Sequence, residues 1–156
     1  SPTGTCAPPR RSLRTPTTAC PGEVRRVIDT SGWLAILVGV PESERIVRAI
    51  ESSVKRLLGT PVLVEASAVV QARKGPGGEV ALDALLRRLS VETVPFSDTA
   101  ATVARLAYSR FGRGVGSPGV LNYGDCLSYG VAVALRQPLL FKGDDFKQTD
   151  VLAVEY

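Results

Sequence analysis

Carboxylates stand at several points of the chain where they could do chemistry, and the first of them follows a short apolar run. Asp29 comes directly after Val27 and Ile28, and the hydroxyl residues Thr30 and Ser31 follow it. An apolar run that passes into Asp, Thr and Ser is typical of a buried strand ending where a helix begins. Ligands of open α/β sheets bind at the carboxyl ends of strands, which favours a functional Asp29. Capping of the next helix explains the same pattern equally well.

The second acid, Glu65, interrupts an apolar segment, 62–70, that we expect to form a helix buried on nearly all sides. A buried carboxylate is unfavourable unless it is paired or binds a metal ion, so this position favours a functional role. The alternative is a narrow exposed stripe on which Glu65 lies with Ser67 or Gln71.

The remaining acids stand at a helix start and in a turn. Asp125 follows Asn122 by three residues, which is the spacing of a capping box. A capping role is compatible with a functional one, because the cap would hold the carboxylate rigidly. Asp144 and Asp145 follow a predicted strand, 138–141, and would share the sheet edge of the first acid if both strands are parallel. A Gly-Asp-Asp sequence is also common in simple turns.

The residue types in this set limit the chemistry that they could perform. Carboxylates are hard oxygen ligands, which suit Mg²⁺ or Mn²⁺ better than zinc or copper. A metal ion bound in this way can activate water and neutralise the charge of a phosphodiester. The chain has no histidine, which excludes Ser-His and Cys-His nucleophile pairs and histidine-ligated zinc. Its three cysteines form no Cys-x-x-Cys pair.

The elements that must position these acids alternate between strand and helix, which implies parallel pairing with right-handed crossovers. We therefore predict a three-layer α/β/α sandwich with a central, mainly parallel sheet. Thr60 and Pro61 are expected to be the cap and the first residue of their helix. The predicted strands are 26–29, 56–58, 91–94, 138–141 and 151–154, and the predicted helices are 31–38, one opening at 41–44, 60–73, 79–89, 98–111 and 123–136.

Composition divides the chain into two parts. Residues 1–25 are rich in Pro, Thr and Arg without periodicity and are predicted to form a disordered basic leader, whereas 26–156 form the folded domain. Residues 1–26 contain five arginines and one glutamate, so they account for the whole net charge of +4. The basic balance is therefore weak evidence for nucleic-acid binding by the domain. Because no apolar run approaches the roughly 20 residues of a membrane helix, we expect a cytoplasmic protein.

Four segments together resemble PIN-domain proteins, in particular the VapC toxins of prokaryotic type II toxin–antitoxin systems. They stand in the order and with the spacing of that family. The resemblance implies a PIN-like sandwich and an endoribonuclease that cleaves RNA with Mg²⁺ or Mn²⁺. The segments are 27–31, Glu65, 121–126 and 138–146.

The resemblance also assigns roles to individual residues. One departure concerns the fourth acid, because the family more often has Thr-x-Asp where this chain has 141–143, Phe-Lys-Gly. We favour Asp144 as the fourth acid and keep Asp145 as a structural partner of the turn. The implied catalytic acids are Asp29, Glu65, Asp125 and Asp144, the implied metal ligands are Asp29, Asp125 and Asp144, and the supporting residues are Thr30, Ser31, Asn122 and Asp145.

The resemblance further implies a cognate antitoxin, an RNA substrate, a homodimer, and operator DNA contacted only through the antitoxin, with no membrane association. The main alternative is a weakly or non-catalytic interaction module that pairs with an antitoxin and helps to regulate operator DNA binding. The complete acid set favours the enzyme. An aspartyl phosphatase is disfavoured, because Ser31 stands where a second acid is usual. Candidates for contacting RNA phosphates are Arg73, Lys74, Arg110, Arg113 and Lys142.

Overall fold

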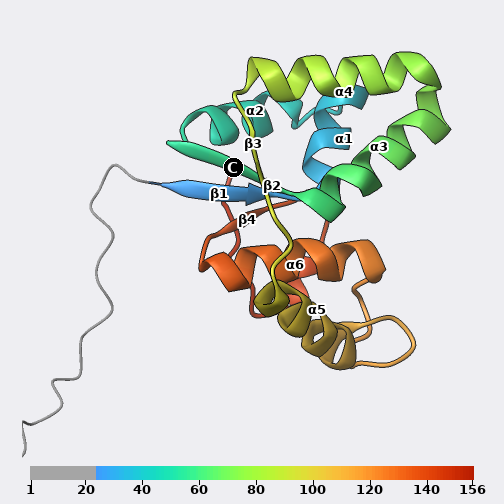
Figure 1. The fold of residues 1–156 in the computed structure, drawn as a ribbon, viewed down its shortest axis with the longest axis vertical. Helices are drawn as coiled ribbons and strands as arrows, with labels where there is room; N and C mark the ends of the chain where they lie inside the picture. Colours follow the sequence, from blue (N-terminus) through green and yellow to red (C-terminus); the bar gives the residue numbers. More distant parts are fainter. Residues whose placement is uncertain (1–23) are drawn as a thin grey trace, which may run out of the picture.

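The structure, a computed structural model that describes residues 24–156, has a central sheet of four parallel strands between two layers of helices (Figure 1). The order of the strands is β3-β2-β1-β4. This arrangement confirms the predicted α/β/α sandwich. The strands are β1 (Arg25–Ile28), β2 (Lys55–Gly59), β3 (Glu92–Val94) and β4 (Leu139–Leu140), and the helices are α1 (Thr30–Val38), α2 (Ser43–Glu51), α3 (Thr60–Lys74), α4 (Pro76–Arg88), α5 (Asp98–Phe111), α6 (Tyr123–Leu135) and the 3-10 helix η1 (Phe146–Gln148).

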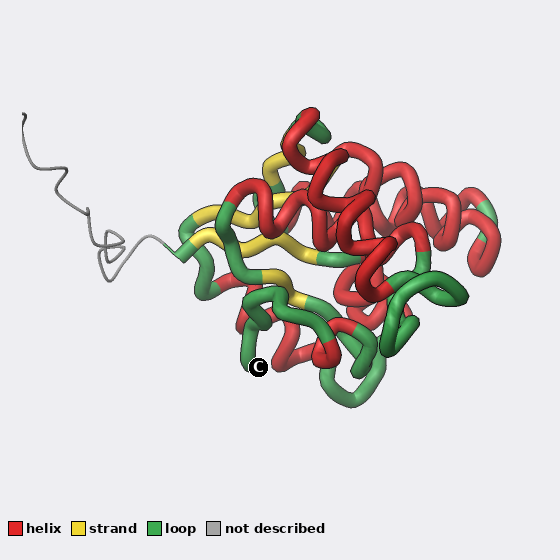
Figure 2. The backbone as a smooth tube through the Cα atoms, turned by 90° about the horizontal axis from the view of Figure 1, so that it is seen from below, coloured by secondary structure: helices red, strands yellow, loops and turns green. Residues whose placement is uncertain are grey.

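Neighbouring residues of the central strands belong to two different hydrophobic clusters, because successive side chains of a strand point to opposite faces. One cluster packs the sheet against α5 and α6, and the other packs it against α1 to α4. Figure 1 shows the two helical layers on opposite sides of the sheet, and Figure 2 shows the strands (yellow) side by side. The residue pairs that divide in this way are Val27 and Ile28, Leu57 and Leu58, and Leu139 and Leu140.

The parallel register brings three strand ends to one edge of the sheet. Val27 pairs with both Leu57 of β2 and Leu139 of β4. The amide of Asp29 donates to the carbonyl of Leu140 at 2.9 Å, which extends the pairing by one residue. The segments that leave β1, β2 and β4 therefore begin side by side, and this edge is where the predicted acids must meet.

Two local predictions are wrong. Residues 151–154 do not form a strand but make a single parallel bridge, in which Ala153 lies opposite Leu139. Within residues 24–156, this segment pairs with the two-residue strand β4 alone, which offers too little backbone for a longer ladder. Gly59 rather than Thr60 occupies the N-cap of α3, so that no side chain caps this helix.

The chain before β1 lies largely outside the described residues. The predicted disordered leader, 1–25, falls there except for its last two residues, and Arg25 already belongs to β1. Cys6 and Cys20 are also outside the described part, whereas Cys126 is a free, buried thiol in α6. Across residues 24–156, no helix combines the length and the apolar character needed to cross a membrane.

Candidate active site

Asp29 is held at the carboxyl end of β1 by hydrogen bonds to both of its carboxylate oxygens. It is 3% exposed and occupies the N-cap of α1. Oδ2 accepts hydrogen bonds from the amide of Ser31 at 2.9 Å and from its hydroxyl at 2.6 Å. Oδ1 accepts a hydrogen bond from the hydroxyl of Ser128 on α6 at 2.5 Å. Asp29 therefore caps α1, as one interpretation of the sequence pattern predicts, and it also presents a fixed carboxylate at the sheet edge, where its functional role stays a prediction.

Glu65 reaches the same place from α3. Its carboxylate is half-buried and accepts a hydrogen bond from the buried hydroxyl of Thr30 at 2.7 Å. On the other side it lies against Gly124 of α6, where any Cβ would collide with the carboxylate oxygens. A side chain at this position would force the carboxylate of Glu65 to move, so Gly124 leaves the space in which Glu65 lies next to the first turn of α6.

The prediction that the helix around Glu65 is buried on nearly all sides is wrong. Val64 and Ala68 are exposed, so α3 has a solvent face. The alternative, an exposed stripe that Glu65 shares with Ser67 or Gln71, is not its environment either, because both of these side chains bond to Glu79 of α4. Apolar composition alone did not distinguish the buried face from the exposed one.

Asp125 lies in the first turn of α6 and closes the predicted capping box. Its carboxylate accepts a hydrogen bond from the amide of Asn122 at 2.8 Å, and the side chain of Asn122 accepts one from the amide of Asp125 at 2.8 Å. Burial raises the pKa of Asp125 to about 6, partly offset by the amide of Asn122 and reinforced by the charges of Asp29, Asp145 and Glu65. Burial also raises the pKa of Glu65, with a further contribution from the charge of Asp29. These shifts indicate that the carboxylates lie close enough for the charge of one to raise the pKa of another.

The two acids of the Gly-Asp-Asp turn differ in environment. Asp144 is highly exposed and pairs with Lys147 at 2.8 Å, and this hydrogen bond lowers the pKa of Asp144. Asp145 pairs with Arg113 at 2.9 Å, and its charge is among those that raise the pKa of Asp125. The geometry thus brings Asp145 to the acid group and leaves Asp144 with its lysine, opposite to the order of preference derived from the sequence. The catalytic role of either residue stays a prediction.

Two of the five predicted phosphate-contacting bases lie close to the acids. Arg113 does so through Asp145, and the backbone amide of Lys142 donates to the hydroxyl of Ser31 at 2.9 Å, whereas the ammonium group of Lys142 pairs with Glu42 at 3.6 Å. Lys74 instead donates to the carbonyl of Leu37, and Arg110 pairs with Asp150 near the end of the chain. Arg73 lies exposed in the last turn of α3.

The acid group consists of Asp29, Glu65 and Asp125, with Asp145 at its border. Among residues 24–156, no three Asp, Glu, Cys or His side chains lie close enough together to surround a metal ion as they stand. Each member instead uses its oxygens in hydrogen bonds to hydroxyls or amides. The donor set nevertheless fits Mg²⁺ or Mn²⁺, because it consists of hard oxygens. Burial and, to a smaller extent, neighbouring carboxylates raise the pKa values of Glu65 and Asp125, and a cation would relieve this cost of their charge.

Sequence reasoning missed two residues of this site. Ser128 is fully buried and bonds to Asp29, and Gly124 provides the space for Glu65. A signal for Ser128 exists in its spacing, because it follows Asp125 by three residues and so lies on the same face of α6. Gly124 has no such signal, since its role depends on contact with a distant helix.

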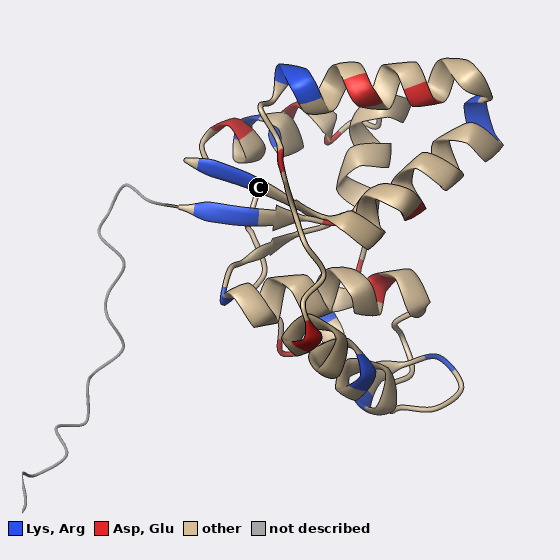
Figure 3. Ribbon diagram, in the orientation of Figure 1, with Lys and Arg blue, Asp and Glu red and all other residues tan. Residues whose placement is uncertain are grey.

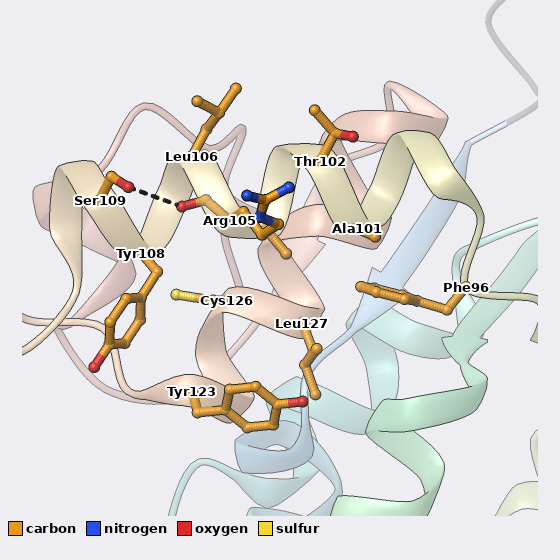
Figure 4. Close-up of a pocket in the computed structure, with 11 residues that line it drawn as sticks. Phe96, Ala101, Thr102, Arg105, Leu106, Tyr108, Ser109, Tyr123, Cys126 and Leu127 are labelled. Carbon is orange, nitrogen blue, oxygen red and sulfur yellow. Dashed lines mark hydrogen bonds between the residues drawn. The ribbon is translucent and has the colours of Figure 1, made fainter.

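A separate groove of about 660 Å³ lies between α5 and α6 (Figure 4). Its walls are largely apolar and include Phe96, Tyr108 and Tyr123, with Arg105 among them (Figure 4). The acid group does not line it. The groove and the acidic edge therefore are distinct features, and only the second carries a constellation of reactive groups.

Comparison with known proteins gives consistent matches. The family model described as PIN domain matches residues 26–152. The chain is 44% identical over 128 residues to ribonuclease VapC30 of Mycobacterium tuberculosis, which covers 82% of this chain and 97% of that protein. It is also 44% identical over 128 residues to ribonuclease VapC of Mycolicibacterium smegmatis, with coverage of 82% and 98%.

Solved structures match at the level of the fold. Mycobacterium tuberculosis VapC20, described as a toxin that cleaves the sarcin–ricin loop, superimposes with a TM-score of 0.66 at 18% identity, covering 84% of this chain and 99% of that one. VapBC2 from Rickettsia felis, bound to a DNA fragment from its promoter, gives a TM-score of 0.65 at 18% identity, with coverage of 85% and 98%.

Proposed function

Since this chain belongs to the PIN-domain family and to its VapC-type ribonucleases, we propose that it is a Mg²⁺- or Mn²⁺-dependent endoribonuclease and the toxin of a type II toxin–antitoxin pair. The observation that carries the proposal is the meeting of Asp29, Glu65 and Asp125 at one sheet edge from three separate elements. Burial and mutual repulsion raise the pKa values of Glu65 and Asp125. Such an arrangement is unfavourable for folding alone and is typical of a functional site.

The side chains divide the work as follows. Asp29 and Asp125 would hold the cation, with a turn acid, Asp145 or Asp144, as the third ligand. A cation in this place would lower the pKa of water and neutralise charge on the phosphodiester. Glu65 lies against the same helix turn as Asp125 and has a raised pKa, so it is placed to take up a proton released at the site.

The environment of the acids also supports a polyanionic substrate. Arg113 and Lys142 stand at the border of the acid group, where they could contact phosphates on either side of the cleaved bond. The similar VapBC2 structure, which is bound to a DNA fragment from its promoter, supports an antitoxin as the partner. Contact with operator DNA would then be made through the antitoxin, and the toxin would be a homodimer.

Cleavage of RNA by the purified full chain tests the proposal. We expect products with 5′-phosphate and 3′-hydroxyl ends, formed with Mg²⁺ or Mn²⁺ and abolished by a chelator. A 2′-deoxy substitution at the cleaved position should be tolerated, because the nucleophile is water and not the 2′-hydroxyl. Glu65→Gln should reduce cleavage by at least about 100-fold, whereas Glu79→Gln, a change on the neighbouring α4, should leave it intact.

The same assay separates the enzyme from the interaction module. The module predicts antitoxin capture by the wild type and no cleavage of several structured RNAs with either metal ion. Equal cleavage by wild type and Glu65→Gln would be consistent with the proposed nuclease but would show that Glu65 is not part of its active site.

A further inference from the structure

The hydroxyl of Ser128 is the contact between α6 and the first acid of the site. Ser128 has 0% exposure, and its Oγ donates to Oδ1 of Asp29 at 2.5 Å. The two residues are 99 positions apart in the chain, so the bond depends on the docking of α6 against the end of β1. A serine hydroxyl fully buried in a mostly apolar helix requires a partner, and here the partner is a carboxylate of the acid group.

The hydrogen bonds to Asp29 determine which of its lone pairs stays free. A carboxylate offers about four lone-pair positions, two on each oxygen. Oδ2 already accepts two bonds from Ser31, and Oδ1 accepts one from Ser128. One position remains, and it is on Oδ1. Ser128 therefore decides both the rotation of the carboxylate and the direction in which its last free lone pair points.

Asp125 and Ser128 are three residues apart on α6, so they lie on the same face of one rigid helix. The helix thus supplies one acid of the site directly and orients a second acid through a hydroxyl. We infer that Ser128 is a positioning residue for the cation-binding carboxylate of Asp29, an inference that rests on the proposed function. Partners of metal ligands commonly act in this way, and their loss weakens metal affinity or activity by roughly 10- to 100-fold.

Ser128→Ala in the full chain tests this inference. We expect its Mn²⁺ affinity, measured by calorimetric titration, to fall by about 10-fold. Ser128→Cys, which keeps the volume and a weak donor, should lie between Ser128→Ala and the wild type. A matched control is Ser53→Ala, because Ser53 is also buried, at 3% exposure, and its hydroxyl bonds to the carbonyl of Ala49 in a region away from the acids.

A positioning role and a general loss of stability give different results. If Ser128 acts through Asp29, raising the Mn²⁺ concentration should restore most of the RNA cleavage, and the KM for RNA should stay unchanged. Unchanged Mn²⁺ affinity in Ser128→Ala, or a loss of affinity equal to that in Ser53→Ala, would overturn the inference and leave the proposed function intact. Absence of Mn²⁺ binding by the wild type itself would overturn both, which makes the two failures distinguishable.

Discussion

The two ends of the parallel strands carry opposite charges, basic at the amino ends and acidic at the carboxyl ends. They differ in whether these charged side chains have partners. At the amino ends, three of the four basic residues of β1 and β2 (blue in Figure 3) bond to nearby acceptors. Arg56 donates to the carbonyls of Ile50 and Glu51 at the end of α2, Arg26 bonds to the carbonyl of Ala49, and Lys55 pairs with Glu92. At the carboxyl ends, in the part of the chain that the structure describes, no ion pair involves the three central acids of the site.

This difference separates structural charge from functional charge. Cations that bond to helix carbonyls stabilise the fold, because they satisfy acceptors that the helix end leaves open. Carboxylates gathered without cations oppose folding, and burial raises the pKa of Asp125 to about 6 in response. Substitutions at the acidic end should therefore remove function and spare or improve stability, whereas substitutions at the basic end should do the reverse.

The largest effect is expected for Asp125→Asn. The amide keeps an oxygen that can accept from the amide of Asn122, so the cap should persist, but the charged ligand is lost. We expect Mn²⁺ affinity to fall by at least about 100-fold, beyond the range for partners of ligands. The metal-free melting temperature should stay equal or rise. Calorimetric titration and thermal unfolding measure these quantities.

Asp98→Asn is the matched control for this change, because Asp98 also stands in the first turn of a helix, α5, and lies outside the acid group. Retention of wild-type Mn²⁺ binding by Asp125→Asn would remove Asp125 from the site. A large fall in the melting temperature would show that its charge stabilises the fold, which would contradict the contrast between the two ends of the sheet.

An intermediate effect should distinguish the two acids of the turn. Asp145 shares the field of Asp125, whereas Asp144 pairs with Lys147 in solvent. We expect Asp145→Asn to reduce cleavage by about 10-fold or more, as for other groups that support metal binding. Asp144→Asn should change it less than about twofold, since exposed pairs contribute little. Initial rates at fixed Mg²⁺ decide between them, and the reverse order would restore the preference derived from the sequence.

The sequence was sufficient to predict the alternation of strands and helices and the positions of Asp29, Glu65 and Asp125 along it. It was insufficient to predict what surrounds each of these acids. Asp29 and Asp125 could be predicted because a strand end and a capping box are local patterns, and the structure contains both. The choice between Asp144 and Asp145 depends on their ion pairs. Asp144 pairs with Lys147, and Asp145 pairs with Arg113, which belongs to a distant loop. The spacing of Ser128 from Asp125 places it on the same face of α6, but its bond to Asp29 depends on the docking of α6 against the end of β1. The role of Gly124 depends on the packing of α6 against α3, for which a single sequence carries no period or motif.

A smaller effect concerns pH. The folded pKa of Asp125 is about 6, above its ordinary value of 3.8, so the folded protein keeps a proton that the unfolded chain releases between these values. The free energy of unfolding of the metal-free protein should therefore fall as pH rises from about 4 to about 6, and level off above that. With solvent screening, we expect roughly 1 kcal/mol for this partly exposed group.

Urea unfolding of wild type and Asp125→Asn at pH 4.5 and pH 7 isolates this contribution, because the difference between the proteins cancels other titrating groups. The advantage of the variant should be greater at pH 7. A constant difference between the two proteins at both pH values would show that the carboxylate of Asp125 is not destabilised in the fold.

The smallest effect is expected at the basic end. Arg56→Ala removes two hydrogen bonds, of 3.0 and 2.9 Å, to the carbonyls at the end of α2. Because the residue is partly solvated, we expect a loss of about 1 kcal/mol, or a fall of roughly 2–4 °C in the melting temperature for a domain of this size. Arg56→Lys should recover only part of this loss, since an ammonium group cannot reproduce the planar fork that contacts two carbonyls.

Mn²⁺ affinity and RNA cleavage at 25 °C should remain at wild-type values in both variants. Impaired cleavage by a fully folded Arg56→Ala would mean that the amino ends of the strands also serve the reaction, and the division of the sheet into a structural and a functional end would fail.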